Sequence, residues 1–173
     1  MTQRHLTIAP LPRRPGPEGE HDIRHFAVVR LDAPSAFLST YELERAGEPA
    51  DWMARLDASA WFVASWRGQP VGLAAGESSW DRYPTERDLV GMWVRPSHRR
   101  MGVAAQLVTS VRDWATDQAA DTLALWIIDG NAAARSAYLK YGFNFVRTAP
   151  SARDPSVMAH KFALPLPVST TVG

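Results

Sequence analysis

The feature that most constrains the fold is an apolar segment, Leu123–Ile128, that lies between two segments of helical character. Its nearly continuous apolar residues are typical of a β-strand that is covered on both faces. The preceding segment, Gly102–Gln118, repeats apolar residues with the helical period. The following segment, Asn131–Tyr141, ends at Gly142, a natural helix C-cap. Helices that alternate with a buried strand predict a mixed α/β fold.

The rest of the chain adds short strands and further helices. Arg67–Gln69 carries turn signals between two strand-like runs and predicts a β-hairpin, whereas the polar segment Ser78–Arg87 is predicted to be a loop. The predicted strands are Leu6–Ala9, Ala60–Trp66, Pro70–Ala75, Leu89–Val94, Leu123–Ile128, Phe143–Arg147 and Val157–Leu164, and the predicted additional helices are Glu20–Leu31 and one that follows Pro49. These elements predict an α/β (α+β) class, with a mixed central sheet of about seven strands flanked by about four helices.

Length and composition exclude several classes of protein. The 173 residues suit a single domain over 1–173, with a core at about 5–165 and a flexible tail at 166–173. A net charge of +1 argues against nucleic-acid and membrane partners. The chain has no cysteine, and its 5 histidines form no metal-ligand pattern, so we expect no metal site. No membrane span or signal peptide is recognisable, which predicts a cytoplasmic protein.

The segment most informative about function runs from Val94 through Arg99, Arg100 and Gly102 into the helix. A strand that passes through a basic loop with one glycine into a helix places unpaired backbone N–H groups at the helix start. Such a site suits a phosphate or pyrophosphate group. The segment is neither a Walker A loop nor a Rossmann fingerprint. The alternative is a plain tight connection whose arginines are solvated.

Two motifs extend this interpretation. Arg99-x-x-Gly102-x-Ala104 resembles the acyl-CoA-binding signature of the GNAT superfamily of N-acetyltransferases. Asn131-x-x-Ala134-x-x-Ala137-Tyr138-x-x-x-Gly142-Phe143 is similar to the second signature of that superfamily. Both motifs lie on the expected elements and in the expected order. The resemblance covers almost the whole chain and implies a bacterial, acetyl-CoA-dependent enzyme with the GNAT fold, whose sheet is splayed between its fourth and fifth strands.

The resemblance also implies a cofactor site. Backbone amides of the loop would hold the CoA pyrophosphate, and the residues concerned are Arg99, Arg100, Met101, Gly102, Val103, Ala104 and Ala105. The main chain of Trp93 and Val94 would pair with the pantetheine arm. Asn131 would contact the same arm, and Arg135 would reach a CoA phosphate. Gly91 suggests an irregularity inside the strand, because glycine in a strand often marks a bulge.

The expected reaction moves the acetyl group of acetyl-CoA to a primary amine by direct attack. Tyr138 resembles the general acid of the superfamily, although its position also suits a core tyrosine. The general base is less well specified: Asp88 at the start of its strand and Glu77 are the candidates, and ordered water is the alternative. A non-catalytic acyl-CoA-binding regulatory module is the rival function.

The acceptor is constrained only weakly. Trp80, Tyr83, Phe37 and Tyr41 favour a flat or apolar acceptor, whereas an acidic cluster favours a cationic amine; its members are Glu42, Glu44, Glu48 and Asp51. A small-molecule amine and a peptide amine both fit these features. The resemblance further implies a homodimer.

Overall fold

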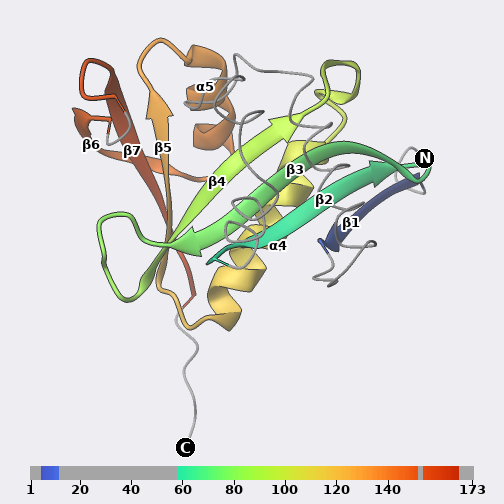
Figure 1. Ribbon diagram of the computed structural model, residues 1–173, viewed down its shortest axis with the longest axis horizontal. Helices are drawn as coiled ribbons and strands as arrows, with labels where there is room; N and C mark the ends of the chain where they lie inside the picture. The colour runs from blue at the N-terminus through green and yellow to red at the C-terminus, as the bar shows by residue number, and fades with distance from the viewer. Residues whose placement is uncertain (1–4, 12–57, 152–153, 168–173) are drawn as a thin grey trace, which may run out of the picture. The chain divides into compact units, whose positions relative to one another are not determined.

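The computed structural model describes residues 5–11, 58–151 and 154–167 (Figure 1). Several predictions lie outside these residues: the helix at Glu20–Leu31 and the helix after Pro49. The same holds for two candidate acceptor aromatics, Phe37 and Tyr41, and for the acidic cluster of Glu42, Glu44, Glu48 and Asp51.

The described residues form one mixed sheet, two α-helices and a short 3₁₀ helix. The elements are β1 (Leu6–Pro10), β2 (Ala60–Trp66), β3 (Gln69–Ser78), β4 (Glu86–Val94), η3 (Pro96–His98), α4 (Val103–Asp117), β5 (Thr122–Ile128), α5 (Ala132–Lys140), β6 (Asn144–Pro150) and β7 (Met158–Pro165). The 7 strands follow the order β1-β2-β3-β4-β5-β7-β6. This arrangement confirms the predicted α/β class and the mixed central sheet.

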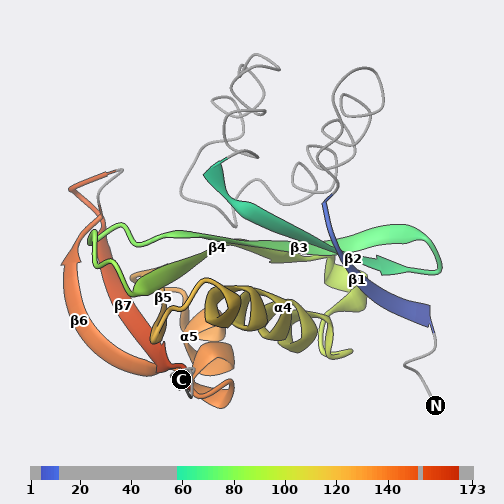
Figure 2. The ribbon, with the colours of Figure 1, turned by 90° about the horizontal axis from the view of Figure 1, so that it is seen from below.

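Strand pairing sets which residues share a face of the sheet. β4 pairs in parallel with β5, and the register joins Glu86–Asp88 to Thr122–Ala124. β5 pairs antiparallel with β7 over its whole length, and β7 pairs antiparallel with β6, which lies beside it (Figure 2). Lys161 of β7 is therefore opposite both Trp126 of β5 and Arg147 of β6. Residues directly opposite one another point to the same face, so these three side chains are neighbours.

The chain divides into two compact units. Of the described residues, one unit holds 5–11, 58–75 and 91–111, and the other holds 76–90, 112–151 and 154–167. The first unit buries apolar side chains of β2, β3 and the start of α4, among them Trp61, Leu73 and Leu107. The second buries side chains of β5, β7 and the segment after α5, among them Leu123 and Phe162. No helix in the described part of the chain is long and apolar enough to cross a membrane.

Six of the seven strands differ from their predicted ranges by one to three residues at an end, and the start of β4 is the difference that bears on the site. β4 begins at Glu86, inside the segment that was predicted to be a loop, because the buried carboxylate of Glu86 finds polar partners that its sequence neighbours do not reveal. At the other end of the chain, Leu166 was assigned to a flexible tail. Its side chain is buried, and its N–H donates to the Asp121 carbonyl oxygen at 2.7 Å, so Leu166 belongs to the packed structure.

Candidate active site

The basic loop after β4 leads into α4 with its side chains in solvent. Arg99, Arg100, Met101 and Gly102 are exposed. Gly102 has a φ of +83°, and a Cβ built there would meet no atom within 4 Å, so the space beside its backbone is open. The Arg99 Nε donates to the Val94 carbonyl oxygen at 3.0 Å and thereby ties the loop to the end of β4.

The first turn of α4 presents backbone N–H groups. The first hydrogen bond of the helix runs from Gln106 N to the Gly102 carbonyl oxygen at 3.1 Å, so the N–H groups of Val103, Ala104 and Ala105 precede the helical ladder. Side chains around them are small or exposed, apart from Val103, which is buried. Unpaired N–H groups and the positive end of the helix dipole together suit an anion. The loop therefore has the backbone features of an anion site.

The strand that leads into this loop has a local irregularity. Gly91 has a φ of +62°, and a Cβ built there would come within 2.8 Å of the Trp61 ring. Only glycine suits a position that combines a left-handed backbone with so little room. Trp93 is buried, and its carbonyl oxygen would be 2.9 Å from a Cβ built on Gly72. The predicted irregularity at Gly91 is present.

Asp88 is a buried carboxylate in β4. Its exposed fraction is 1%, and its Oδ2 accepts a hydrogen bond from the Trp80 backbone N–H at 2.7 Å. Among the described residues, its Oδ1 has no hydrogen-bond partner. Burial raises the pKa of Asp88 to about 6; the charges of Glu86 and Glu77 act in the same direction, whereas the Trp80 N–H and Lys161 oppose them. The expectation that Asp88 lies at the start of its strand was wrong, because β4 begins two residues earlier.

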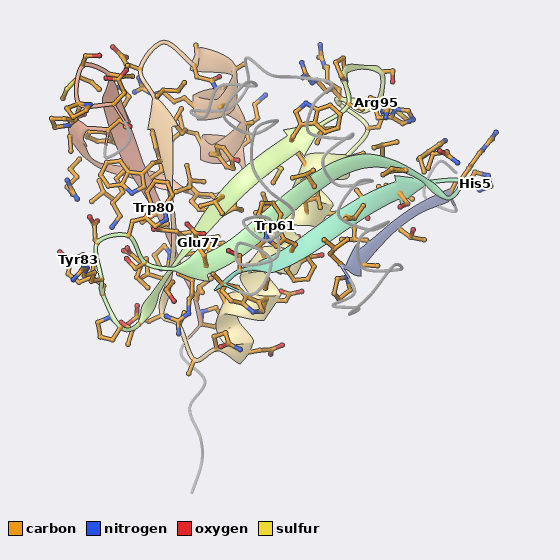
Figure 3. The ribbon with its side chains drawn as sticks, viewed as in Figure 1. His5, Trp61, Glu77, Trp80, Tyr83 and Arg95 are labelled. Atoms are coloured by element: carbon orange, nitrogen blue, oxygen red, sulfur yellow. The ribbon has the colours of Figure 1, made fainter. Side chains whose placement is uncertain are left out.

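Trp80 connects the two candidate bases. Its backbone N–H binds Asp88, and its indole Nε1 donates to Glu77 Oε1 at the end of β3. Figure 3 shows Glu77 and Trp80 beside each other, with Tyr83 farther along the same loop. Both Trp80 and Tyr83 are exposed. The structure therefore places Glu77 next to the group that holds Asp88, and Glu77 itself is half-buried.

The second motif folds into α5. The Asn131 side-chain oxygen accepts a hydrogen bond from Ala134 N at 3.1 Å and caps the helix, while Arg135 is exposed. Tyr138 is buried, and its ring packs edge-to-face on Tyr141 and Phe143, with centroids 6.2 and 5.5 Å apart. Burial, with a smaller contribution from Tyr141, raises the pKa of Tyr138 above its ordinary value. The hydroxyl therefore stays protonated at physiological pH.

The predicted site residues fall into separate groups. Trp80 brings Asp88 and Glu77 together, and α5 carries Asn131, Arg135 and Tyr138. The residues from Trp93 to Ala105 belong to the other unit. Two charged residues that act on Asp88, Glu86 and Lys161, were not among the predicted site residues, and neither was Asp81, which pairs with Lys161. A signal existed, because Lys161 is a lysine inside a mostly apolar strand.

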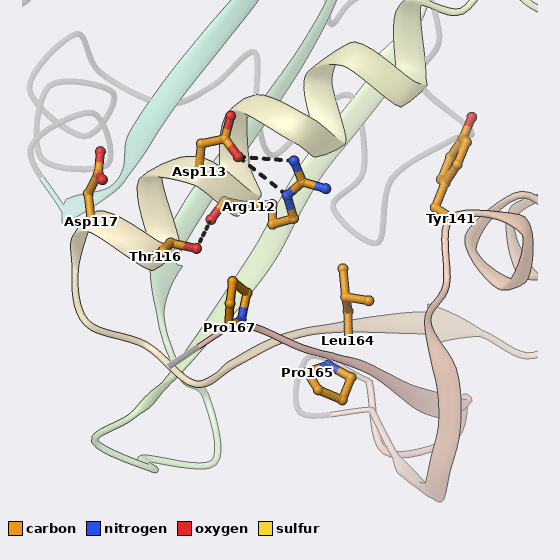
Figure 4. Close-up of a pocket in the computed structure, with 8 residues that line it drawn as sticks. All are labelled: Arg112, Asp113, Thr116, Asp117, Tyr141, Leu164, Pro165 and Pro167. Atoms are coloured by element: carbon orange, nitrogen blue, oxygen red, sulfur yellow. Dashed lines mark hydrogen bonds and ion pairs between the residues drawn. The ribbon is translucent and has the colours of Figure 1, made fainter. Parts of the chain in front are cut away.

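A separate pocket of about 460 Å³ lies in the second unit (Figure 4). Its lining residues are Arg112, Asp113, Thr116, Asp117, Tyr141, Leu164, Pro165 and Pro167. Arg112 forms an ion pair with Asp113 at 3.1 Å, and the Thr116 hydroxyl donates to the Arg112 carbonyl oxygen. None of the predicted site residues lines this pocket.

Comparison with known proteins assigns the family. The model of the acetyltransferase (GNAT) family matches residues 26–143, which is more than half of the chain. The chain therefore belongs to the acetyltransferase (GNAT) family, and the expected acyltransferase class is confirmed at this level. The comparison with curated protein sequences finds no match.

Solved structures show the same fold. An N-acetyltransferase from Staphylococcus aureus Mu50 is 19% identical with a TM-score of 0.69, over 94% of this chain and 99% of that chain. The yncA protein of Salmonella typhimurium, solved with its cofactor acetyl-CoA, is 17% identical with a TM-score of 0.73, over 95% of each chain. The ribosomal-protein-S18-alanine N-acetyltransferase of Escherichia coli is 20% identical with a TM-score of 0.65, over 97% of this chain and 98% of that chain.

Proposed function

We propose that this protein transfers the acetyl group of acetyl-CoA to a primary amine by direct attack, with Asp88 as general base and Tyr138 as general acid. The observation that carries the proposal is the state of Asp88: a buried carboxylate with one oxygen unpartnered among the described residues and a pKa of about 6. A base of this kind is ionised at neutral pH and is still strong enough to accept a proton.

The proton balance of the reaction uses both residues. The amine arrives protonated, because ordinary primary amines have a pKa well above neutral pH. Asp88 accepts a proton from the ammonium, the free amine nitrogen forms a bond to the thioester carbon, and the carbon–sulfur bond breaks. Tyr138 donates its hydroxyl proton to the departing thiolate. The proton on Asp88 then leaves through solvent, and Tyr138 regains the one that the attacking nitrogen loses.

The proposed donor site uses the loop and helix N-terminus that follow β4. Backbone amides of Arg99–Ala105 would bind the pyrophosphate, and the main chain of Trp93 and Val94 would pair with the pantetheine arm. Asn131 would contact that arm through its amide nitrogen, since its oxygen caps α5. Arg135 would pair with a CoA phosphate. The support is the open backbone at Gly102, the N–H groups of the first helical turn, and the acetyl-CoA bound by the Salmonella protein.

Replacing Gly102 by Glu is expected to weaken acetyl-CoA binding by about 10-fold or more, because a carboxylate would stand where the phosphates bind. Isothermal titration calorimetry with acetyl-CoA measures the effect. Gly68→Glu is the matched control: Gly68 has a similar φ of +79° and equally open surroundings, but it lies in the β2–β3 turn. The control should lose similar stability and keep its affinity. Unchanged affinity in Gly102→Glu would place the donor elsewhere.

The acceptor in this proposal is a small-molecule or peptide amine. The Escherichia coli neighbour acts on the alanine of a ribosomal protein, according to its name, and so supports a peptide amine as one class. The apolar character expected of the acceptor now rests on Trp80 and Tyr83, both exposed in the loop between β3 and β4. The cytoplasmic location and the homodimer stay predictions.

The test of the proposal is thiol release from acetyl-CoA across a panel of small amines and peptides. The chain has no cysteine, so a thiol reagent detects only CoA. We expect release that depends on an amine and exceeds a blank without amine. If the protein binds acetyl-CoA and releases no thiol with any amine or peptide, the proposal fails and the non-catalytic module is favoured.

A further inference from the structure

Lys161 is a buried lysine at the centre of an ion-pair cluster. Its side chain is 4% exposed, and its Nζ lies 2.5 Å from Asp81 Oδ2 and 2.8 and 2.9 Å from the two Glu86 carboxylate oxygens. Lysine is almost never buried unless it is paired. Burial opposes the charged form of Lys161, but the hydrogen bonds to Asp81 and Glu86 outweigh it and raise the pKa of Lys161. The ammonium is therefore charged throughout the physiological range.

This ammonium binds two residues around the loop that connects β3 to β4, one inside the loop and one at the start of β4. Asp81 follows directly after Trp80, and Glu86 opens β4. The Ser79 hydroxyl donates to Glu86 Oε1 at 2.5 Å, and the outer face of Asp81 pairs with Arg147 at 2.7 Å. Asp81 and Glu86 both bind the Lys161 Nζ. This shared contact holds the two ends of segment 81–86 close together.

The loop that Lys161 closes is the one that contacts Asp88. Trp80 N donates to Asp88 Oδ2, and Trp80 is the immediate neighbour of Asp81. Three charged groups act on Asp88 from the surrounding elements: Glu86 on its own strand, Glu77 on β3 and Lys161 on β7. Lys161 is the only cation among the three.

We propose that Lys161 is a positioning residue for Asp88: it closes the β3–β4 loop so that the Trp80 N–H stays on Asp88, and its charge favours the ionised carboxylate. The inference rests on the proposed role of Asp88 as general base. Lys161 lies in β7, outside the two family motifs on the β4–α4 loop and on α5. Lys161 touches neither substrate in this proposal and acts only through Asp88.

A purely structural ion pair would affect stability and leave the titration of Asp88 unchanged. The direct measurement is therefore the pKa of Asp88, which carbon-13 NMR of its carboxyl group reports. The Asp88→Asn variant assigns the carboxyl signal. The second measurement is the acid limb of kcat/KM between about pH 5 and 9. The NMR titration requires no turnover, so it tests Lys161 even if the protein proves to have another activity.

Lys161→Met should move both the NMR titration and the acid limb upward by about 0.5 pH unit or more, because it removes the one favourable charge. Below the limb, this corresponds to about a threefold loss of kcat/KM. Lys161→Arg should restore the wild-type limb. Arg147→Met is the matched control, because it removes a cation that also binds Asp81 but does not act on Asp88.

Glu86→Gln should shift the titration of Asp88 in the opposite direction. It also provides a second test if Lys161→Met fails to fold. It removes a negative charge beside Asp88, so the titration should move downward. Unshifted titrations in Lys161→Met, or in Glu86→Gln where the first variant does not fold, would overturn the proposal while leaving the function of Asp88 intact. Wild-type activity that is independent of Asp88 would instead overturn the proposed function.

Discussion

Replacement of Asp88 by Asn is expected to lower kcat/KM by about 10²- to 10⁴-fold, the range typical of losing a general base. The substitution keeps the shape of the side chain and its bond from Trp80 N but removes the group that takes the proton. In the wild type, kcat/KM should fall on the acid side near pH 6, where Asp88 becomes protonated. The thiol-release assay, run from about pH 5 to 9, measures both effects.

Glu77→Gln is the matched control for this substitution. It also removes one carboxylate bound to Trp80, yet Glu77 is only half-buried and its Oε1 is engaged by the indole. We expect a loss below about 10-fold and an acid limb that moves down, because one negative neighbour of Asp88 is gone. A larger loss in Glu77→Gln than in Asp88→Asn would make Glu77 the base.

The same Asp88→Asn variant should change the pH dependence of stability. The pKa of Asp88 is about 6 in the folded protein, against 3.8 for a free side chain, so between these values the folded state binds more protons than the unfolded state. The wild type therefore loses stability as the pH rises through this window, by about 2 to 3 kcal/mol in total. Asn does not titrate, so the variant lacks this loss. Urea unfolding at a series of pH values should show the free energy of unfolding of the variant increasing relative to that of the wild type as the pH rises.

Replacement of Tyr138 by Phe should lower kcat by about 100-fold while leaving acetyl-CoA affinity nearly unchanged, because only the proton donor is lost. The ring would keep its edge-to-face contacts with Tyr141 and Phe143. Thiol release measures the lowered kcat, and calorimetry measures the unchanged affinity for acetyl-CoA. Because burial raises the pKa of Tyr138, we expect no loss of activity from its ionisation up to about pH 10.

Tyr141→Phe is the control for the loss of a hydroxyl in the same aromatic group. Tyr141 lies three residues farther on, is half-buried and lines the separate pocket. Its kcat should stay within about threefold of the wild type. Equal kcat in Tyr138→Phe and the wild type would remove Tyr138 from the mechanism.

The conformation of the loop between β4 and α4 could be predicted from sequence because its features are local. The strand end, the basic residues, Gly102 and the helix start lie within about ten residues, and glycine before an amphipathic helix indicates the open turn directly. The Asn131–Tyr138 helix was predictable for the same reason. In both cases the conformation of a residue is determined by neighbours in its own turn or helix.

The surroundings of Asp88 could not be predicted in this way. Whether its carboxyl is buried depends on the pairing of β4 with β5 and of β5 with β7, which brings Lys161 to Glu86 across 75 positions of sequence. From the sequence neighbours alone, Glu86 is predicted to be a solvated loop residue and the strand is predicted to start at Leu89. The raised pKa of Asp88 follows from burial, which no spacing of residues expresses.

The burial of Lys161 also affects whether the protein itself can be acetylated. Lysine amines are the side chains that an acetyl thioester modifies, whereas arginine guanidinium groups stay protonated and do not react. The sequence contains 19 basic residues, of which only Lys140 and Lys161 are lysines. Lys161 is enclosed and held in its ammonium form by two carboxylates, so Lys140 is the one lysine whose side chain is exposed. If the protein uses acetyl-CoA as proposed, almost all of its basic side chains are therefore guanidinium groups that do not react with the thioester.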